Sequence, residues 1–324
     1  MAPSRSASRP QFPIPNSPIH RFIGPPIHEL TLRRNPAAHF GVPWYAGIRE
    51  RETSGRHTMD QAVIIGIGRE ILRGRIQDAN SWTLARRLTG LGVRILRIVA
   101  CDDDLSAIIR EVHRAQEDGA RLILTTGGLG PTDDDLTLAA LAEATGRPLV
   151  LDEEARRLVA SRYVALHQAG AVDDPAMTPT REKMAHIPQG ARVLPNPVGA
   201  APAVWLEVGR TTLVALPGVP AEMAAILEAS VLPALAAQTP GTIYLERIIR
   251  TQARDESQVA PVLRRVAQEL PEVFLKSHPT GFGSDVRMEV FASTWAGRRT
   301  VAEERLARAL ALVREALGEA PPDI

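Results

Sequence analysis

The stretch TTGGLGPTDDDLT, residues 125–137, joins two segments with different patterns. Before it, the short apolar run ARLIL (120–124) is typical of a buried strand. After it, LTLAALAEA (136–144) contains no Gly or Pro and is rich in helix-forming residues. The sequence therefore predicts a strand, a glycine-rich turn and a helix whose first turn carries carboxylates.

The turn has the composition of a phosphate site that uses a metal ion. Gly127, Gly128 and Gly130 lack the Cβ atoms that would keep a ligand away from the backbone. Their N–H groups and a helix N-terminus can then bind a phosphate. The three aspartates at 133–135 suit a divalent cation that bridges phosphate and carboxylate. The alternative is that these aspartates only cap the helix.

Bulk composition narrows the class of protein. With 324 residues, 44% of them hydrophobic, the chain can bury a substantial core and hold a second, smaller domain. A net charge of +1 argues against a dedicated nucleic-acid binder. A single cysteine excludes an internal disulfide and fits a reducing compartment, and no apolar run is long enough to cross a membrane. We expect a cytoplasmic protein with neither nucleic acid nor membrane as its partner.

Residues 1–58 differ from the rest of the chain. They contain repeated prolines, scattered Arg and Ser and few acids, and they hold no regular period, so we predict a disordered extension. Arg and Ser with few acids resemble an organellar transit peptide, but the prolines oppose the amphipathic helix that such peptides need. The alternative is that the native protein starts at Met59, just before the first clear strand.

From Met59 onward, strand and helix signals alternate, which predicts a mostly parallel sheet covered on both faces. Ligands of such sheets bind at the carboxyl ends of the strands. The turns at 66–70 and 101–104 and the glycine motif all follow predicted strands, so we expect them to line one pocket. The predicted strands are 62–68, 93–100 and 121–125, with helices at 81–91 and from 105.

The glycine motif resembles the signature of the CinA family (competence/damage-inducible protein A), whose core belongs to the MoaB/Mog molybdopterin-binding superfamily. Three residues depart from the family pattern: Arg69 stands where Asp or Thr is usual, and Cys101 and Ala203 each replace a Gly. The other segments that carry the resemblance are GREIL (68–72) with Gly74 and Asn80, Cys101-Asp102, AHIPQG (185–190), NPVGAAP (196–202) and LPGVPAEM (216–223).

The resemblance implies a three-layer α/β/α MoaB/Mog-like domain over 59–239 and a small α+β KH-like subdomain over 240–324. The tail pattern agrees, because strand, helix, two strands and a final helix are predicted at 243–251, 255–270, 273–278, 285–293 and from about 300. Leu306, Leu310, Val313 and Leu317 give the last helix an apolar face. A Gly-x-x-Gly clamp between helices is missing, so we expect no RNA binding. A homodimer is also implied, and the nicotinamide-mononucleotide deamidase domain of CinA proteins has no counterpart in this sequence.

For function, the resemblance implies metal-dependent hydrolysis of the pyrophosphate in ADP-ribose or a related dinucleotide such as FAD, with Mg²⁺ or Co²⁺. The catalytic candidates are Asp102, Asp135 and Glu70, the first two also holding the metal. The substrate-binding candidates are Asn80, Gly127, Gly128, Gly130, Pro131, Thr132, Asp134, Asn196, Gly199, Pro217 and Gly218. Two alternatives stay open: an adenylyl-transferring protein of the Mog type with molybdopterin as ligand, and a non-catalytic nucleotide binder.

Each candidate also has a purely structural interpretation. Glu70 and Asp102 suit helix caps, and Asn80 lies where an N-cap is expected. Pro217-Gly218 is an ordinary turn on chemistry alone. In the polar segment 151–183, Arg181 and Lys183 can reach ligand phosphates or belong to a solvated face.

Overall fold

The structure is a computed structural model that describes residues 59–239, 241–281 and 285–319. The extension predicted at 1–58 lies outside the described residues, and so does the predicted domain boundary at 240. The division into three parts therefore stays a prediction, and residues 59–239 and 241–319 are described separately.

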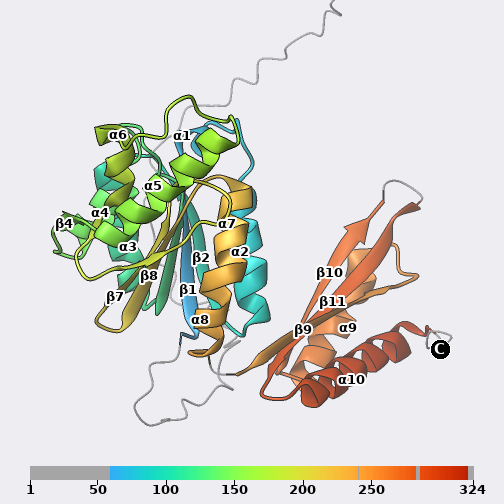
Figure 1. The fold of residues 1–324 in the computed structure, drawn as a ribbon. Helices are drawn as coiled ribbons and strands as arrows, with labels where there is room; N and C mark the ends of the chain where they lie inside the picture. Colours follow the sequence, from blue (N-terminus) through green and yellow to red (C-terminus); the bar gives the residue numbers. More distant parts are fainter. Residues whose placement is uncertain (1–58, 240, 282–284, 320–324) are drawn as a thin grey trace, which may run out of the picture. The chain divides into compact units, whose positions relative to one another are not determined.

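Residues 59–239 form one six-stranded sheet in the order β2-β1-β3-β8-β7-β6 (Figure 1). The pairs β1/β2, β1/β3 and β3/β8 are parallel, whereas β8/β7 and β7/β6 are antiparallel. A further two-stranded antiparallel sheet pairs β4 with β5. The strands are β1 (Gln61–Ile67), β2 (Arg94–Cys101), β3 (Leu122–Thr126), β4 (Leu149–Leu151), β5 (His186–Pro188), β6 (Arg192–Leu194), β7 (Ala203–Val208) and β8 (Thr211–Leu216).

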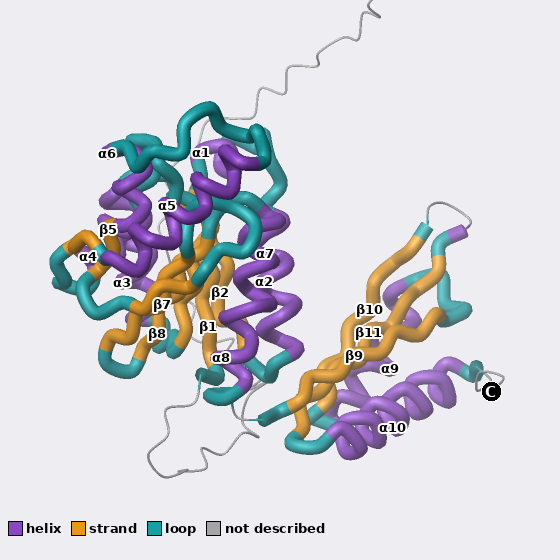
Figure 2. Tube along the Cα trace, in the orientation of Figure 1, coloured by secondary structure: helices purple, strands orange, loops and turns teal. Residues whose placement is uncertain are grey.

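Helices cover both faces of this sheet, as Figure 2 shows. Side chains of β1 alternate between two cores: Val63 and Ile65 pack with α3, α4 and α5, and Ile64 packs with α2, α7 and α8. The predicted three-layer α/β/α fold is confirmed. The helices are α1 (Arg69–Leu72), α2 (Ala79–Gly90), α3 (Leu105–Glu117), α4 (Thr137–Ala144), α5 (Glu153–Gln168), α6 (Pro179–Glu182), α7 (Pro220–Ile226) and α8 (Leu232–Ala236), with η1 (Lys183–Ala185) and the π-helical η2 (Leu227–Val231).

Two local predictions were wrong. Asn80 is not the N-cap of its helix, because α2 begins at Ala79 and the carboxylate of Asp78 accepts the N–H of Ser81. The aspartates of the glycine motif are not in the first turn of a helix either, since α4 begins at Thr137 and no side chain caps it. The antiparallel β6, β7 and β8 were not foreseen, because no strand was predicted between residues 126 and 239.

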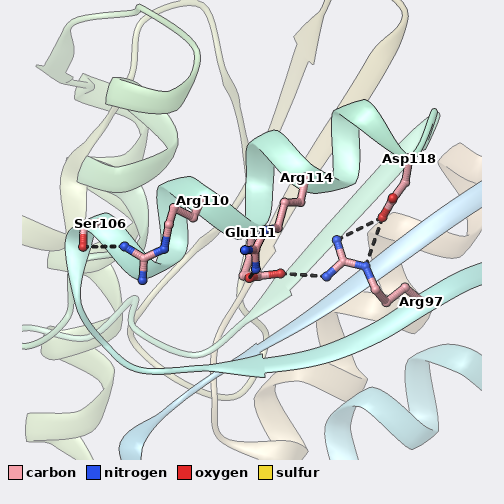
Figure 3. Close-up of polar contacts among 6 residues, drawn as sticks. All are labelled: Arg97, Ser106, Arg110, Glu111, Arg114 and Asp118. Atoms are coloured by element: carbon pink, nitrogen blue, oxygen red, sulfur yellow. Dashed lines mark hydrogen bonds and ion pairs between the residues drawn. The ribbon is translucent and has the colours of Figure 1, made fainter. Parts of the chain in front are cut away.

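A network of charged side chains fixes α3 against the edge strand β2 (Figure 3). Arg97 of β2 donates to Glu111 at 2.7 Å and to Asp118 at 3.0 Å, and Arg114 also donates to Glu111 at 2.7 Å. Burial alone would raise the pKa of Glu111, but the two guanidinium groups outweigh it and hold that pKa below its ordinary value. The short turn between β2 and α3 is thereby held in place, and it carries Asp102 and Asp103.

Residues 241–319 form a second layered unit. Its three-stranded antiparallel sheet has the order β10-β11-β9 and packs its own apolar core against two helices. The predicted order of strand, helix, two strands and helix is confirmed. The elements are β9 (Ile243–Arg250), α9 (Glu256–Glu269), β10 (Val273–Thr280), β11 (Arg287–Ala296) and α10 (Arg299–Leu317).

Among the helices that the structure describes, none is both long enough and apolar enough to cross a bilayer.

Candidate functional site

The ends of β1, β3 and β8 meet in direct backbone contact. The N–H of Gly127, just after β3, donates to the carbonyl of Leu216 on β8 at 3.0 Å. Gly127 has φ +110°, and a Cβ at this residue would overlap the carbonyl oxygen of Ile67 on β1. A Cβ at Gly218 would lie 3.3 Å from the Cα of Gly127. Glycine is required at Gly127 by both its conformation and its surroundings.

These strand ends form the floor of a pocket of about 430 Å³. Five of its side chains are carboxylates, namely Glu70, Asp103, Asp134, Asp135 and Glu222. None of the described lining residues is Lys, Arg or His. The other lining residues are Ile67, Gly68, Gly127, Gly128, Leu129, Gly130, Pro131, Thr132, Tyr163, Met184, Ala200, Ala201, Pro217, Gly218 and Val219. The charged side chains that line the pocket are therefore all acidic.

The turn after the glycines is closed by Asp135. Its Oδ2 accepts hydrogen bonds from the N–H of Thr132 at 2.8 Å and from the hydroxyl of Thr132 at 2.7 Å. The N–H of Asp135 in turn donates to the carbonyl of Thr132 at 3.1 Å. The Thr132 hydroxyl also contacts Asp134, and this contact lowers the pKa of Asp134. Asp135 therefore shapes the turn while it lines the pocket.

Three of the pocket carboxylates lie directly against the Cα of a glycine. A Cβ at Gly130 would lie 2.6 Å from Oδ2 of Asp135. A Cβ at Gly68 would overlap the carboxylate of Glu70, and one at Gly199 would overlap that of Glu222. Each glycine makes room for an acid, so glycines and acids together set the shape of the pocket.

Asp102 and Asp103 have different positions, although they are neighbours in sequence. Asp103 lines the pocket and Asp102 does not. Oδ1 of Asp102 lies 2.9 Å from Nε of Arg69, and Oδ1 of Asp103 lies 3.3 Å from Nη2 of the same residue. A hydrogen bond between the two carboxyls raises the pKa of Asp103 and lowers that of Asp102. The hydrogen bond to Asp102 likewise raises the pKa of Arg69.

Three predicted binding residues lie outside this pocket. Asn80 is buried, and its side-chain N–H₂ donates to the hydroxyl of Thr126 and to the carbonyl of Gly218, both at 2.8 Å. Asn196 donates to Glu222 at 2.6 Å, and its Oδ1 accepts the N–H of Gly199 at 2.8 Å. These residues position the pocket wall: Asn80 holds the 217–218 turn, and Asn196 holds Glu222. Asn196 and Gly199 line a smaller neighbouring cavity of about 80 Å³.

The opposite wall is apolar and was not predicted from the sequence. Tyr163 of α5 is the aromatic residue among the described lining residues, and the guanidinium of Arg181 lies 3.8 Å from its ring centroid. Met184 and, within the glycine turn, Leu129 are further apolar lining residues. Tyr163 lies in a helix with a polar sequence, where no motif marks it. Glu222 belongs to the recognised LPGVPAEM segment and could have been selected there.

Not every glycine N–H of the motif is available to a ligand. That of Gly127 is used by the sheet, as described above. The N–H groups of Gly128, Leu129 and Gly130 make no hydrogen bond within the part of the chain that the structure describes. Lys183 donates to the carbonyl of Thr132, so its ammonium lies beside the same turn. The phosphate-binding donors are thus expected at 128–130.

The carboxylates fit one kind of metal site. Within residues 59–239, 241–281 and 285–319, no three His, Cys, Asp or Glu side chains are placed together to hold an ion. Mg²⁺ needs no such cage, because it keeps several waters and binds through one or two carboxylates together with the phosphates of a substrate. Asp103 and Asp135 of the pocket suit this arrangement.

Cys101, which ends β2, is expected to resist thiol reagents in the folded protein. Burial raises the pKa of its thiol to about 12, and only the thiolate reacts. The folded chain keeps this proton to a higher pH than the unfolded chain does, so the free energy of unfolding should fall as the pH rises from about 9 towards 12. At pH 8, Ellman's reagent should react with one thiol per chain only in denaturant. A rapid reaction without denaturant would contradict this burial.

The fold and the pocket define an α/β protein with a pocket at the carboxyl ends of parallel strands. The model of the family described as "Probable molybdopterin binding domain" matches residues 63–237, and the chain belongs to this family. A protein of Pyrobaculum arsenaticum is 41% identical over 221 residues, which are 68% of this chain and 80% of that protein. A protein of Thermococcus kodakarensis is 38% identical over 231 residues, 71% of this chain and 90% of that protein.

Among solved structures, the protein CinA from Thermoplasma acidophilum, described as of unknown function, is similar with 37% identity and a TM-score of 0.47. The similarity covers 52% of this chain and 95% of that one. A tungsten cofactor synthesizing protein MoaB from Pyrococcus furiosus is 16% identical with a TM-score of 0.37, covering 56% and 97%. The sequence-based recognition of the MoaB/Mog molybdopterin-binding superfamily is confirmed by the family match.

Proposed function

We propose that this protein is a metal-dependent nucleotide pyrophosphatase that hydrolyses ADP-ribose or a related dinucleotide such as FAD. In this reaction the oxygen of a water molecule forms a bond to one phosphorus, and the bond from that phosphorus to the bridging oxygen breaks. ADP-ribose would give AMP and ribose 5-phosphate. The CinA resemblance suggests the reaction, and the chemistry of the pocket supports it.

The observation that carries the proposal is the pairing of a glycine backbone with five carboxylates in a pocket whose described lining contains no basic side chain. The backbone N–H groups at 128–130 suit phosphate oxygens, whereas the carboxylates repel them. A divalent cation bound together with the phosphates would offset the repulsion from the carboxylates and leave the N–H groups to bind phosphate oxygens. When bound, such a cation would polarise a phosphoryl oxygen and lower the pKa of an attacking water.

The chain's own residues have separable roles in this proposal. Asp103 and Asp135 would hold the cation, and Gly128 and Gly130 would donate N–H groups to the charge that develops on the phosphoryl oxygens. The apolar wall at Tyr163 and Met184 would bind the planar ring of the ligand, since an aromatic side chain stacks on such rings.

The test is a product assay on the full chain with ADP-ribose, FAD, ATP and NAD, each incubated with Mg²⁺, with Co²⁺ and with chelator. Release of AMP that requires the metal is expected for the dinucleotides. Asp135→Ala should lower turnover by about 100-fold or more, because it removes a carboxylate from the pocket and loosens the turn that presents the glycines.

The matched control is Asp133→Ala. Asp133 is the same residue type in the same turn, but it is exposed and does not line the pocket, so turnover should stay within about twofold. If no nucleotide is hydrolysed under any metal condition, the pyrophosphatase proposal is wrong. If Asp133→Ala is as damaging as Asp135→Ala, the turn as a whole matters rather than the pocket carboxylate.

A second candidate follows from the family itself. The described function of the matched domain is molybdopterin binding, and the pocket has an apolar wall for a ring beside a phosphate-binding turn. In that case the protein would bind a pterin phosphate, or transfer an adenylyl group to one, without releasing AMP to water. Retention of ADP-ribose or a pterin phosphate without product would favour this candidate or a non-catalytic binder.

A further inference from the structure

The guanidinium of Arg69 is a positive charge that the chain itself places beside an acidic side chain of the pocket. It is the first residue of the short helix α1, directly after Gly68, which has no Cβ. Its Nε lies 2.9 Å from Oδ1 of Asp102, and its Nη2 lies 3.3 Å from Oδ1 of Asp103. One guanidinium thus spans both carboxylates at the end of β2.

We propose that Arg69 acts as an internal counter-ion that competes with a divalent cation for Asp103. The inference rests on the proposed function only in assuming that a cation belongs in this pocket. Asp103 is the one of the two acids that lines the pocket, and its Oδ1 is ion-paired with Arg69 at 3.3 Å without a hydrogen bond. A metal ion that binds Asp103 must therefore share this carboxylate with the guanidinium or displace the guanidinium from it.

A cation in the pocket would compete for only one of the two carboxylates that Arg69 contacts. Asp102 is outside the pocket and keeps the shorter contact to Arg69, so the guanidinium retains one partner when Asp103 turns to a cation. Asp134, another lining residue of the pocket, also interacts electrostatically with Arg69. Arg69 is thus a positioning residue: it acts on the site through Asp103, and it would make cation binding depend on the arrival of a phosphorylated ligand.

The experiment measures binding of Mn²⁺ alone, by electron paramagnetic resonance or calorimetry, to the full chain without nucleotide. Arg69→Thr should raise Mn²⁺ affinity by about three- to tenfold, the change expected when one exposed ion-pair partner and its positive charge are removed. Arg69→Lys keeps the charge, so it should leave the affinity within about twofold of the unchanged protein.

Two further variants separate this role from a general charge effect. Arg73→Thr removes an exposed positive charge from the C-cap of the same helix, outside the pocket, and should change the affinity by less than about twofold. In an Asp103→Asn background, Arg69→Thr should no longer increase the affinity, because the contested ligand is gone.

Unchanged or weaker Mn²⁺ binding in Arg69→Thr would overturn the proposal, as would an equal increase in the Asp103→Asn background. Because these readouts use no nucleotide, they are independent of turnover. A protein that hydrolyses nothing can still show the competition, and a hydrolase can lack it.

Discussion

Asp103→Asn is expected to lower the turnover of a dinucleotide by about 100-fold or more, whereas Asp102→Asn should lower it by less than about tenfold. The two variants are the same substitution at adjacent positions. Asp103 lines the pocket, while Asp102 lies outside it and is held by Arg69 at 2.9 Å.

The measurement is the rate of AMP release at saturating metal and substrate, together with KM. Loss of kcat with little change in KM is expected for Asp103→Asn, since its carboxyl would act mainly in the transition state. Thermal unfolding of both variants serves as the control, because neither carboxylate supports the core. A greater loss in Asp102→Asn would show that the reaction is centred on Asp102, as the family resemblance suggested.

Gly127→Ala is expected to destabilise the protein by about 3 kcal/mol, which combines the strain of a left-handed backbone with overpacking. Gly127 has φ +110°, and its added Cβ would overlap the carbonyl of Ile67, a backbone atom that cannot rotate away. Since three strand ends meet at this residue, the overlap cannot be relieved without separating β1 from β3. The melting temperature of the domain formed by residues 59–239 should fall by roughly 10 °C.

Two other glycines provide matched controls in a calorimetric measurement. Gly74 has φ +65° but no atom within 4 Å of its added Cβ, so Gly74→Ala should cost only about 1 kcal/mol of strain. Gly90, in α2, also has open space and no positive φ, so Gly90→Ala should stabilise by up to about 1 kcal/mol. If Gly127→Ala lowers the free energy of unfolding by no more than Gly74→Ala does, the approach of residue 127 to the Ile67 carbonyl is not tight.

The fold was predictable from local patterns because β1 and β3 are short apolar runs that end in glycine turns. The same patterns brought the 66–70 and 101–104 turns and the glycine motif to one edge of the sheet, where the pocket lies. The antiparallel strands β6 to β8 were missed, although β7 and β8 are two β-prone runs joined by Gly209-Arg210, a pattern typical of a hairpin. What no local pattern gives is the parallel pairing of β8 with β3, which places this antiparallel part in the same sheet.

The site was less predictable than the fold. Asp102 was selected through the family resemblance, whereas the pocket is lined by its neighbour Asp103, because the sequence does not show on which side of the turn each carboxylate lies. The catalytic role of Asp102 stays a prediction. Asn80 and Asn196 were expected to bind ligand, yet their hydrogen bonds go to Gly218 and Glu222. Tyr163 comes from a helix far along the chain, and only the folded structure places its ring in the pocket.

β3 and β8 are neighbours in the sheet but are far apart in the sequence, and this separation affects when they pair during folding. β3 ends at Thr126, but its parallel neighbour β8 begins only at Thr211, after three α-helices and four other strands. Such distant pairing is slow to form, because a long loop must close before the contact can stabilise it. On the ribosome, the glycine turn therefore emerges well before the 217–218 wall that completes the pocket. A ligand can therefore bind the complete pocket only after β8 has paired with β3, so the pocket should form later than the pairing of β1 with β2 and β3.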